Sequence, residues 1–293
     1  MRTIKSALSS AIARLVGSDS PMLDAELLLA HVLKTSRAAL RARPERPLTA
    51  EQAGQFEPLI DRRAQGEPVA YLLGRAGFMD FELAVNPSVL IPRPETELLV
   101  ELALETLADS DSPAANQDNI ARIADLGTGS GAIAIALARH NPAWRVEAVD
   151  ISKAALALAR RNAQALGVGN IRFRQASWCE GLPPSAFDLI VANPPYVAKG
   201  DPALHPDCAF EPETSLFAAE DGLAALRQII TTAKHHLKPQ GWLILEHAHN
   251  QQIPVTKLLA TEGYRQIETH KDHAHHDRLI RARLGRSLTQ PLI

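Results

Sequence analysis

Residues 123–140, IADLGTGSGAIAIALARH, set the architecture that we expect for most of this chain. The apolar residues before the glycines are typical of a buried strand, and the alanine-rich residues after them are typical of a helix. Glycines in DLGTGSG, residues 125–131, let a ligand approach the backbone, and a helix N-terminus favours an anionic group such as a carboxylate. No Gly-Lys-Ser/Thr follows, so this is not the Walker pattern. The stretch predicts a strand, a loop and a helix, and leaves open whether the loop binds a ligand or is only a tight turn.

The alternation of strand and helix continues to residue 284. Further strands are predicted at 145–150, 171–175, 187–192, 241–247, 264–270 and 277–284, and further helices at 153–167, 223–237 and 253–263. This pattern predicts an α/β fold, with a mostly parallel seven-stranded sheet covered by helices on both faces. The last two strands are joined by a short connection, so we expect them to form an antiparallel hairpin at the edge.

The first 75 residues have a different pattern, with apolar residues at helical spacing. They predict a small helical-bundle domain, in which Ser20-Pro21 begins one helix and Thr49 begins another that runs toward Gly66. Residues 76–92 predict a β-hairpin connector with its turn at Asn86-Pro87. The second domain is expected over 93–293, with a helix at 95–108 and a loop at 108–119.

The composition excludes several classes of protein. A formal net charge of −2 and an aromatic content of 4% argue against a protein that wraps nucleic acid or stacks bases. Two cysteines, Cys179 and Cys208, are too few for a disulfide scaffold or a cysteine zinc cluster, which favours a reducing compartment. No stretch reaches the roughly 18 apolar residues of a membrane span. Because Arg14 interrupts the apolar start and no cleavage site follows, we expect a cytoplasmic protein and no signal peptide.

Asp150 ends the strand that follows the glycine loop, about 20 residues further along the chain. A carboxylate at this place accepts hydrogen bonds from both hydroxyls of a ribose. The alternative is a helix N-cap, since helical residues follow from Ser152. A dinucleotide enzyme and an S-adenosylmethionine enzyme both fit these two features.

The motif NPPY, residues 193–196, follows the apolar strand FDLIVA. Two prolines make a rigid turn with few donors at the carboxyl edge of the sheet, where ligands bind. The Asn193 side-chain oxygen and the Pro194 carbonyl are two acceptors, and two acceptors suit a planar NH2 group. They would orient its nitrogen toward an electrophile and stabilise the charge that develops there.

Together these motifs resemble the amino-methyltransferases that modify planar nitrogens with S-adenosylmethionine. More narrowly, the chain resembles the release-factor glutamine methyltransferases, the PrmC/HemK family, over nearly its whole length. The resemblance is carried by PVAYLLGRAGF at 68–78, VLIPRPETELLV at 89–100, DLGTGSGAIAIALA at 125–138, FDLIVANPPYV at 187–197, FEP at 210–212, EDGL at 220–223 and LILEH at 243–247. It implies a Rossmann-like methyltransferase domain after a helical domain that recognises the substrate.

The resemblance also implies a reaction and a site. A methyl group would pass from S-adenosyl-L-methionine, leaving S-adenosyl-L-homocysteine, to the amide nitrogen N5 of Gln in the Gly-Gly-Gln motif of class I peptide-chain release factors. The implied cofactor-binding residues are Gly127, Thr128, Gly129, Ser130, Gly131, Asp150, Trp178 and Asn193. The implied glutamine pocket consists of Asn193, Pro194, Pro195 and Tyr196, of which Asn193, Pro194 and Tyr196 are the implied catalytic residues. Packing in the core is the alternative for Trp178.

Three other features allow two interpretations each. Arg93 and Glu97 in IPRPETE either position the substrate or only begin a helix. The basic stretch with Arg37, Arg41, Arg43 and Arg46 either contacts a release factor or is a solvated helix end. His-rich residues 270–276 suggest a metal, but we expect a solvated turn and no metal site.

Competing functions differ in their substrate. A ribosomal-protein glutamine methyltransferase shares NPPY, and the N-terminal helical domain favours the release-factor assignment. An adenine-N6 nucleic-acid methyltransferase also acts on a planar NH2 group, but the charge balance and the low aromatic content argue against it. A non-catalytic cofactor-binding module would not need an intact glycine loop, Asp150 and Asn193 together. We expect a monomer that needs neither nucleic acid nor a membrane.

Overall fold

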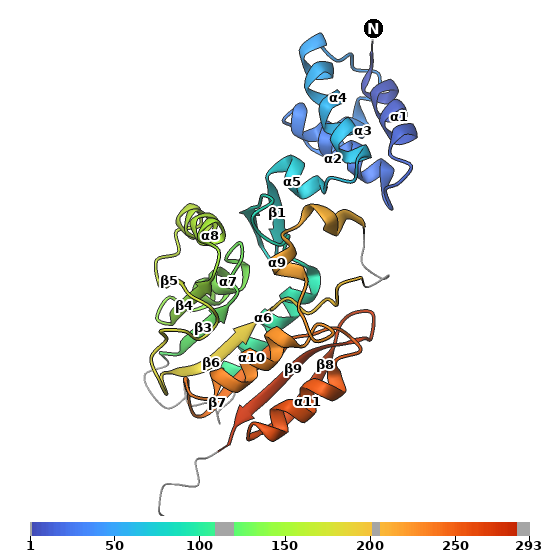
Figure 1. Cartoon of the computed structure of the whole chain (residues 1–293). Helices are drawn as coiled ribbons and strands as arrows, with labels where there is room; N and C mark the ends of the chain where they lie inside the picture. The colour runs from blue at the N-terminus through green and yellow to red at the C-terminus, as the bar shows by residue number, and fades with distance from the viewer. Residues whose placement is uncertain (1, 109–119, 201–205, 286–293) are drawn as a thin grey trace, which may run out of the picture. The chain divides into compact units, whose positions relative to one another are not determined.

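The computed structural model of the protein describes residues 2–108, 120–200 and 206–285 (Figure 1). The chain divides into two compact units. The first consists of the described residues of Met1–Ala76, Val85–Pro87 and Ala203–Glu211, and the second of those of Gly77–Ala84, Ser88–Pro202 and Pro212–Ile293. Apart from Ala108, the loop predicted at 108–119 lies outside the described residues.

The first unit is a helical bundle, as the sequence predicts. Its helices are α1 (Ile4–Arg14), α2 (Pro21–Val32), α3 (Arg37–Ala42), α4 (Ala50–Ala64) and α5 (Val69–Leu73). Thr49 begins α4 through a capping box with Gln52, in which each side chain accepts from the other residue's backbone N–H. Ser20 precedes Pro21 at the start of α2, but its hydroxyl donates to Asp24 and makes no cap bond. The apolar faces meet in a core that includes Ile4, Leu28, Leu29, Phe56 and Ile60.

A short β-hairpin follows, and its predicted turn is wrong. Strand β1 (Arg75–Phe78) pairs with β2 (Phe81–Ala84), and the division between the two units falls within β1. The chain therefore reverses at Met79-Asp80, where Met79 has a φ of 49°, and not at Asn86-Pro87. Phe81 and Leu83 alternate with exposed residues along β2, so burial of these two side chains sets the register.

The second unit contains the predicted seven-stranded sheet, in the order β5-β4-β3-β6-β7-β9-β8. The strands are β3 (Arg122–Leu126), β4 (Arg145–Asp150), β5 (Ile171–Gln175), β6 (Phe187–Ala192), β7 (Leu237–Glu246), β8 (Tyr264–Lys271) and β9 (Asp277–Leu284). Strands β3 to β7 pair in parallel, whereas β9 is antiparallel to both β7 and β8. The predicted edge hairpin is confirmed.

Strand β7 begins earlier than predicted, at Leu237 instead of residue 241. The preceding helix, α10 (Ala224–Ala233), correspondingly ends before the predicted residue 237. The pairing of β7 with β6 shifts in register between Leu237 and Trp242, and Pro239 lies in this irregular stretch. A break in regular pairing tolerates a proline, which has no N–H to donate to the neighbouring strand.

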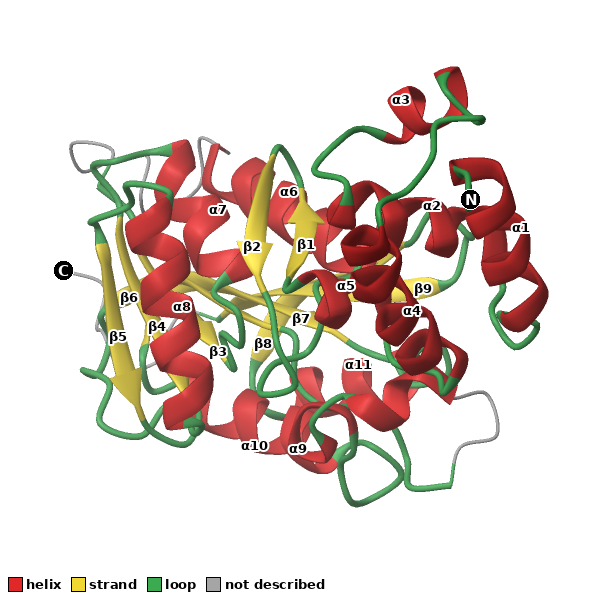
Figure 2. Cartoon of the chain, turned by 90° about the horizontal axis from the view of Figure 1, so that it is seen from above, coloured by secondary structure: helices red, strands yellow, loops and turns green. Residues whose placement is uncertain are grey.

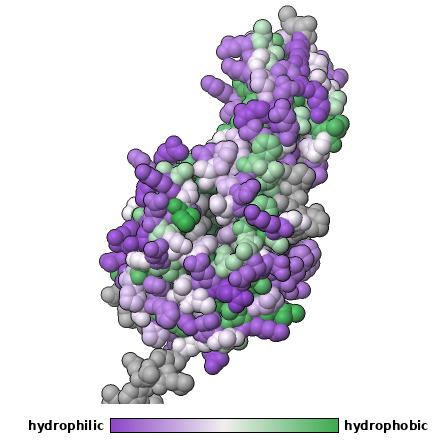
Figure 3. Space-filling model, in the orientation of Figure 1, coloured by the Kyte–Doolittle hydropathy of each residue, from purple (hydrophilic) through white to green (hydrophobic). Residues whose placement is uncertain are grey.

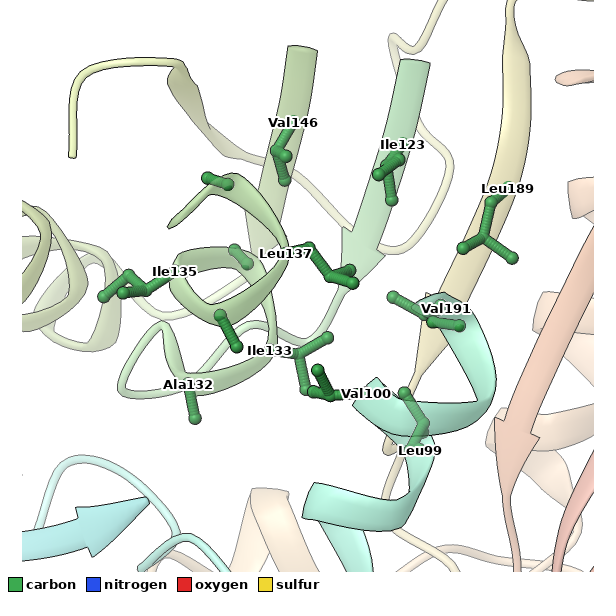
Figure 4. Packing of buried hydrophobic residues seen from close by; sticks show 14 of the residues in the cluster. Leu99, Val100, Ile123, Ala132, Ile133, Ile135, Leu137, Val146, Leu189 and Val191 are labelled. Atoms are coloured by element: carbon green, nitrogen blue, oxygen red, sulfur yellow. The ribbon is translucent and has the colours of Figure 1, made fainter. Parts of the chain in front are cut away.

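Helices cover both faces of the sheet (Figure 2). On one face lie α6 (Pro94–Ala108), α7 (Ala132–His140) and α8 (Lys153–Ala165). Figure 4 shows Leu99 and Val100 of α6 and Leu137 of α7 packed against strand residues of this face. The other face is covered by α10 and α11 (Gln252–Thr261), whose buried residues join a second apolar cluster. The sheet is thus buried on both sides, which explains its nearly continuous apolar strands.

Hydrophilic residues dominate the face of the molecule in Figure 3, with hydrophobic residues scattered among them. In the part of the chain that the structure describes, Val16, Ile151 and Ile253 are the most exposed large apolar residues, and they lie in separate segments: the loop after α1, the loop after β4, and α11. Among the described residues, no helix combines the length and the apolar character of a membrane span.

Candidate active site

A cavity of about 340 Å³ lies at the carboxyl ends of the central strands of the second unit. The sheet order changes direction between β3 and β6, and open α/β sheets bind ligands at such a point. The wall combines the loops after β3, β4, β5 and β6 with the start of α6, and includes Pro92, Thr96, Gly127, Thr128, Gly129, Ser130, Asp150, Ser152, Trp178, Asn193 and Pro195. The structure therefore brings the glycine loop, the acidic strand end and the first residue of NPPY to one cavity.

The glycine loop after β3 needs its glycines for two reasons. Gly127, Gly129 and Gly131 have φ values of 77°, 56° and 87°, in the left-handed region that favours glycine. A Cβ on Gly131 would lie 3.0 Å from Ile135 Cδ1 and 3.1 Å from Ala159 Cβ, so a side chain there would also be tightly packed against the neighbouring helices. The loop is tied to the neighbouring strand, because the backbone N–H groups of Gly127 and Thr128 donate to the Val149 carbonyl at 2.8 and 2.9 Å.

Asp125, the last polar residue of β3, fixes this loop from beneath. Its Oδ2 accepts from the Thr128 hydroxyl at 2.6 Å and from the backbone N–H of Ala134 at 3.2 Å. Burial raises the pKa of Asp125 to about 7, against the effect of these two hydrogen bonds. Our sequence interpretation gave this residue no role, although it opens the motif. Its contacts show that it holds the loop to the start of α7.

Asp150 lies at the end of β4 and on the cavity wall. Its Oδ2 accepts from the Gly129 N–H at 2.9 Å, and its Oδ1 accepts from the Ser152 N–H at 2.8 Å. Ser152, not Asp150, is the N-cap of α8, because its hydroxyl accepts from Ala155 N at 3.2 Å. Burial raises the pKa of Asp150, while the backbone N–H groups lower it. Each carboxylate oxygen has a second lone pair, so the side chain still has capacity for two ribose hydroxyls.

Trp178 forms a wall of the cavity in the loop after β5. Its indole N–H donates to Gln228 Oε1 at 3.1 Å, and its backbone has a positive φ of 47°. A Cβ on Gly127 would lie 3.4 Å from the ring atom Cζ3, so the ring lies against the glycine loop. Trp178 also packs on the apolar cluster of this face. Both interpretations of the residue therefore have support, and a contact with adenine stays a prediction.

Asn193 directly follows β6, and a hydrogen bond to the start of α6 holds its side chain. Its Nδ2 donates to Thr96 Oγ1 at 3.0 Å, and the Thr96 hydroxyl donates to Glu246 Oε2 at 2.9 Å. Tyr196 donates its hydroxyl to the other oxygen of the same carboxylate at 2.8 Å. Burial, with the charge of Glu246, holds the pKa of Tyr196 far above its usual range. The phenol is therefore neutral and acts as a hydrogen-bond donor.

The other predicted substrate residues differ in their relation to the cavity. Pro195 lines it, whereas Pro194, Tyr196, Arg93 and Glu97 are not among its lining residues. Glu97 Oε1 accepts from the Met79 backbone N–H at 2.7 Å, so it fixes the turn of the β1–β2 hairpin. Substrate contacts by these four residues stay predictions.

Sequence reasoning missed residues that support the site. Thr96 lies within the motif IPRPETE, and Glu246 lies within the motif LILEH. Both motifs were part of the sequence resemblance, but neither residue was given a role in the site. Gln251 Nε2 donates to the carbonyls of Tyr196 and Asp221 at 3.0 and 3.1 Å and so connects two loops. In the sequence, the one sign of such a role is that Thr96, Glu246 and Gln251 are polar residues beside an apolar strand or at the start of a helix. The contacts that they make join distant segments, so the sequence does not reveal them.

The basic stretch that begins at α3 and continues to Arg46 has a partner within the first unit. Arg37 Nε donates to Glu26 Oε2 at 2.9 Å, and Arg41 donates to both oxygens of Glu26 at 2.7 and 2.8 Å. Glu26 is only 1% exposed. Two of the four arginines therefore neutralise a buried carboxylate, whereas Arg43 and Arg46 are exposed. Contact of this stretch with a release factor stays a prediction.

We expect Glu26→Gln to lower the free energy of unfolding of the chain by about 1–3 kcal/mol at neutral pH, because it removes charge-assisted bonds. The hydrogen bond from Arg41 is the largest cause that lowers the pKa of Glu26. The stabilisation is therefore present above the unfolded-state pKa and is lost as the pH falls through the lower folded-state pKa. Urea unfolding at a series of pH values measures this, with the exposed Glu51→Gln as control. Equal loss in both variants would contradict the assignment.

The His-rich segment forms the turn between β8 and β9. Asp272 Oδ1 accepts from the backbone N–H groups of Ala274 and His276 at 3.0 and 2.9 Å, which closes the turn. No group of three or more His, Cys, Asp or Glu residues in the described ranges is arranged to hold a metal ion.

Comparison with known proteins agrees with this geometry. The family model "PrmC N-terminal domain" matches residues 6–74, and "Methyltransferase small domain" matches residues 101–206. The chain is 45% identical over 281 residues to the release factor glutamine methyltransferase of Vibrio cholerae, covering 94% of this chain and 95% of that protein. It is 44% identical to the protein of the same name from Coxiella burnetii, covering 92% and 94%.

Solved structures resemble the second unit in fold. A methyltransferase from Pyrococcus furiosus has a TM-score of 0.51 and 17% identity, covering 69% of this chain and 88% of that one. The 16S rRNA N2 G1207 methyltransferase of T. thermophilus, in complex with AdoMet and guanosine, has a TM-score of 0.51 and 21% identity, covering 72% and 49%. At these identities the likeness shows a methyltransferase fold and confirms the fold class that the sequence predicts.

Proposed function

Because the chain belongs to the release factor glutamine methyltransferase family, we propose that its cavity brings S-adenosylmethionine together with the glutamine side chain of a class I release factor. The chain is an S-adenosylmethionine-dependent protein-(glutamine-N5) methyltransferase. The observation that carries the proposal is that Asn193 lines the same cavity as the glycine loop and Asp150. The Gly-Gly-Gln motif is the proposed target within the release factor.

The cavity fits the cofactor in size and in chemistry. Its volume of about 340 Å³ is within the range of small-molecule sites. Asp150 would hold the ribose hydroxyls, residues 127–131 would lie along the methionine part, and Trp178 would lie against the adenine. When bound, S-adenosylmethionine supplies a methyl group on a positively charged sulfur, for transfer to the amide nitrogen with release of S-adenosylhomocysteine.

The chain's own contribution is to orient the glutamine amide. An amide nitrogen is a poor nucleophile because its lone pair is delocalised, so placing it against the electrophile supplies much of the rate. Asn193 offers a side-chain oxygen to one amide hydrogen, and the carbonyl of Pro194 is proposed for the other. Among the described residues that line the cavity, Asp150 alone has a titratable side chain, and both of its oxygens accept backbone N–H groups. The site thus favours loss of the amide proton after transfer without a dedicated base.

The test offers labelled S-adenosylmethionine and four substrates to the purified chain: a class I release factor, its Gly-Gly-Gln→Gly-Gly-Ala variant, ribosomal protein and DNA. We expect one methyl group on the glutamine of the intact motif, located by mass spectrometry, and none on the variant. Methylation of ribosomal protein or of DNA alone would replace the proposal by the corresponding alternative. A monomeric state, a cytoplasmic location and independence from nucleic acid and membrane stay predictions.

We expect Asp150→Ala to weaken S-adenosylmethionine binding by about tenfold or more, because hydrogen bonds to a charged group contribute about 1.5–3 kcal/mol each. Titration calorimetry of the purified variant measures the Kd. Asp80→Ala is the matched control, since Asp80 is an exposed aspartate that pairs with Arg139 and is absent from the cavity wall. An unchanged Kd in Asp150→Ala would remove the ribose role from the proposal.

A further inference from the structure

A chain of hydrogen bonds runs from the cavity wall into the core of the second unit. It links Asn193, Thr96, Glu246 and Tyr196, with donor–acceptor distances between 2.8 and 3.0 Å. Three elements meet there: Thr96 lies in the first turn of α6, Asn193 follows β6, and Glu246 ends the neighbouring strand β7. Asn193 is the end of this series of hydrogen bonds at the cavity wall. In the proposed function, Asn193 is the residue that binds the substrate amide.

The direction of these bonds follows from what each group can donate. A carboxylate only accepts, so the single hydroxyl hydrogen of Thr96 is used on Glu246. The Thr96 oxygen can then only accept from Asn193, which must turn its NH2 group toward Thr96. The amide oxygen of Asn193 is thereby left as the acceptor. If the Asn193 amide were free to flip, half of its orientations would turn its NH2 group toward the NH2 group of glutamine. Two NH2 groups cannot form the hydrogen bond that the amide oxygen would accept.

We propose that Thr96 and Glu246 are positioning residues, which lock the Asn193 amide so that its oxygen faces the reacting glutamine. The inference rests on the proposed function and extends it to two residues outside NPPY. Glu246 is the member of this hydrogen-bond series that is held most firmly, because it is 1% exposed and both of its carboxyl oxygens accept hydrogen bonds. Thr96 transmits this fixed orientation to the cavity, and it is 5% exposed.

Opposing effects act on the Glu246 carboxyl group. Burial is the largest and raises its pKa, as does Glu95 on α6, whereas the charge of Arg278 on β9 favours the carboxylate form. Arg278 is itself paired with Asp272 at 3.2 Å. Tyr196 adds a hydrogen bond that lowers the pKa of the carboxyl group. The donors of Thr96 and Tyr196 thus both act on the carboxylate form.

The test removes only the hydroxyl of Thr96. We expect Thr96→Val, which keeps the side-chain shape, to lower kcat about 10–100-fold on a release factor while the Kd for S-adenosylmethionine stays unchanged. Thr96→Ser should recover most of this loss because it restores the hydroxyl. Thr106→Val is the matched control, since Thr106 is a buried threonine of the same helix that donates to Leu102 O and is absent from the cavity wall. Thr96→Ala provides a second deletion if the valine variant does not fold.

A double-mutant cycle with Asn193→Ala separates positioning from a general structural effect. If Thr96 acts through Asn193, Thr96→Val should cause no further loss of kcat in the Asn193→Ala background. Equal losses in both backgrounds, or wild-type kcat in Thr96→Val, would overturn the inference alone. Absence of methyl transfer to the release factor by the unmodified chain would overturn the proposed function, and the inference with it.

Discussion

Replacing Asn193 with Ala is expected to lower kcat for glutamine methylation by about 10²–10³-fold, the loss typical of removing one preorganised polar group at a reacting centre. The residue follows β6 on the cavity wall, and its NH2 group donates to Thr96. Deleting it removes the acceptor that would hold the substrate nitrogen. Steady-state kinetics with labelled cofactor and a saturating release factor measure the effect.

The fold should survive this substitution. Asn193 is half-buried at a loop, and its truncation leaves no apolar cavity in either core. The midpoint of thermal unfolding is therefore expected to change little. Asn141→Ala is the matched control, because Asn141 follows α7, its side-chain oxygen accepts from the Ala143 N–H at 3.0 Å, and it is absent from the cavity wall. Turnover near the wild-type value in Asn193→Ala would contradict the catalytic role.

Gly222→Ala is expected to cause the largest loss of stability that we predict for a single methyl group. Gly222 has a φ of 86°, and an added Cβ would overlap the carbonyl oxygen of Tyr196 and lie 2.6 Å from Gln251 Nε2. Left-handed strain costs about 1–2 kcal/mol and overpacking a further 1–3 kcal/mol. Because the methyl group pushes on the backbone of NPPY, turnover should fall together with the free energy of unfolding.

The control for this variant separates the two causes. Gly263 has a φ of 90°, yet a Cβ there would meet nothing within 4 Å. Gly263→Ala should therefore show the conformational cost alone, with normal kcat. Denaturant unfolding and kinetics of both variants decide the matter. If both variants lost the same free energy of unfolding and Gly222→Ala kept its turnover, the prediction would be contradicted. The loop behind Tyr196 would then shift to make room for the added methyl group.

Local patterns predicted most of the fold. Alternating apolar strands and helices gave the parallel sheet and its edge hairpin, because burial on both faces demands such sequences. The errors lie where a tertiary contact overrides a local signal. Asn86-Pro87 has turn chemistry, but burial of Phe81 and Leu83 places the hairpin turn at Met79-Asp80. Strand β7 begins earlier than predicted and includes Pro239 in a stretch where its pairing with β6 is irregular.

By itself, the sequence predicted most of the elements and singled out the motif residues that the structure brings to one cavity: the glycine loop, Asp150 and Asn193. These depend on short-range requirements, such as glycine at positive φ, and neighbouring residues reveal them. Only the tertiary structure decided which groups hold them in place. Thr96 and Glu246 are 150 positions apart in the chain and meet because α6 and β7 pack together. The direction of a hydrogen bond is a property of such contacts between distant segments, and no local pattern encodes it.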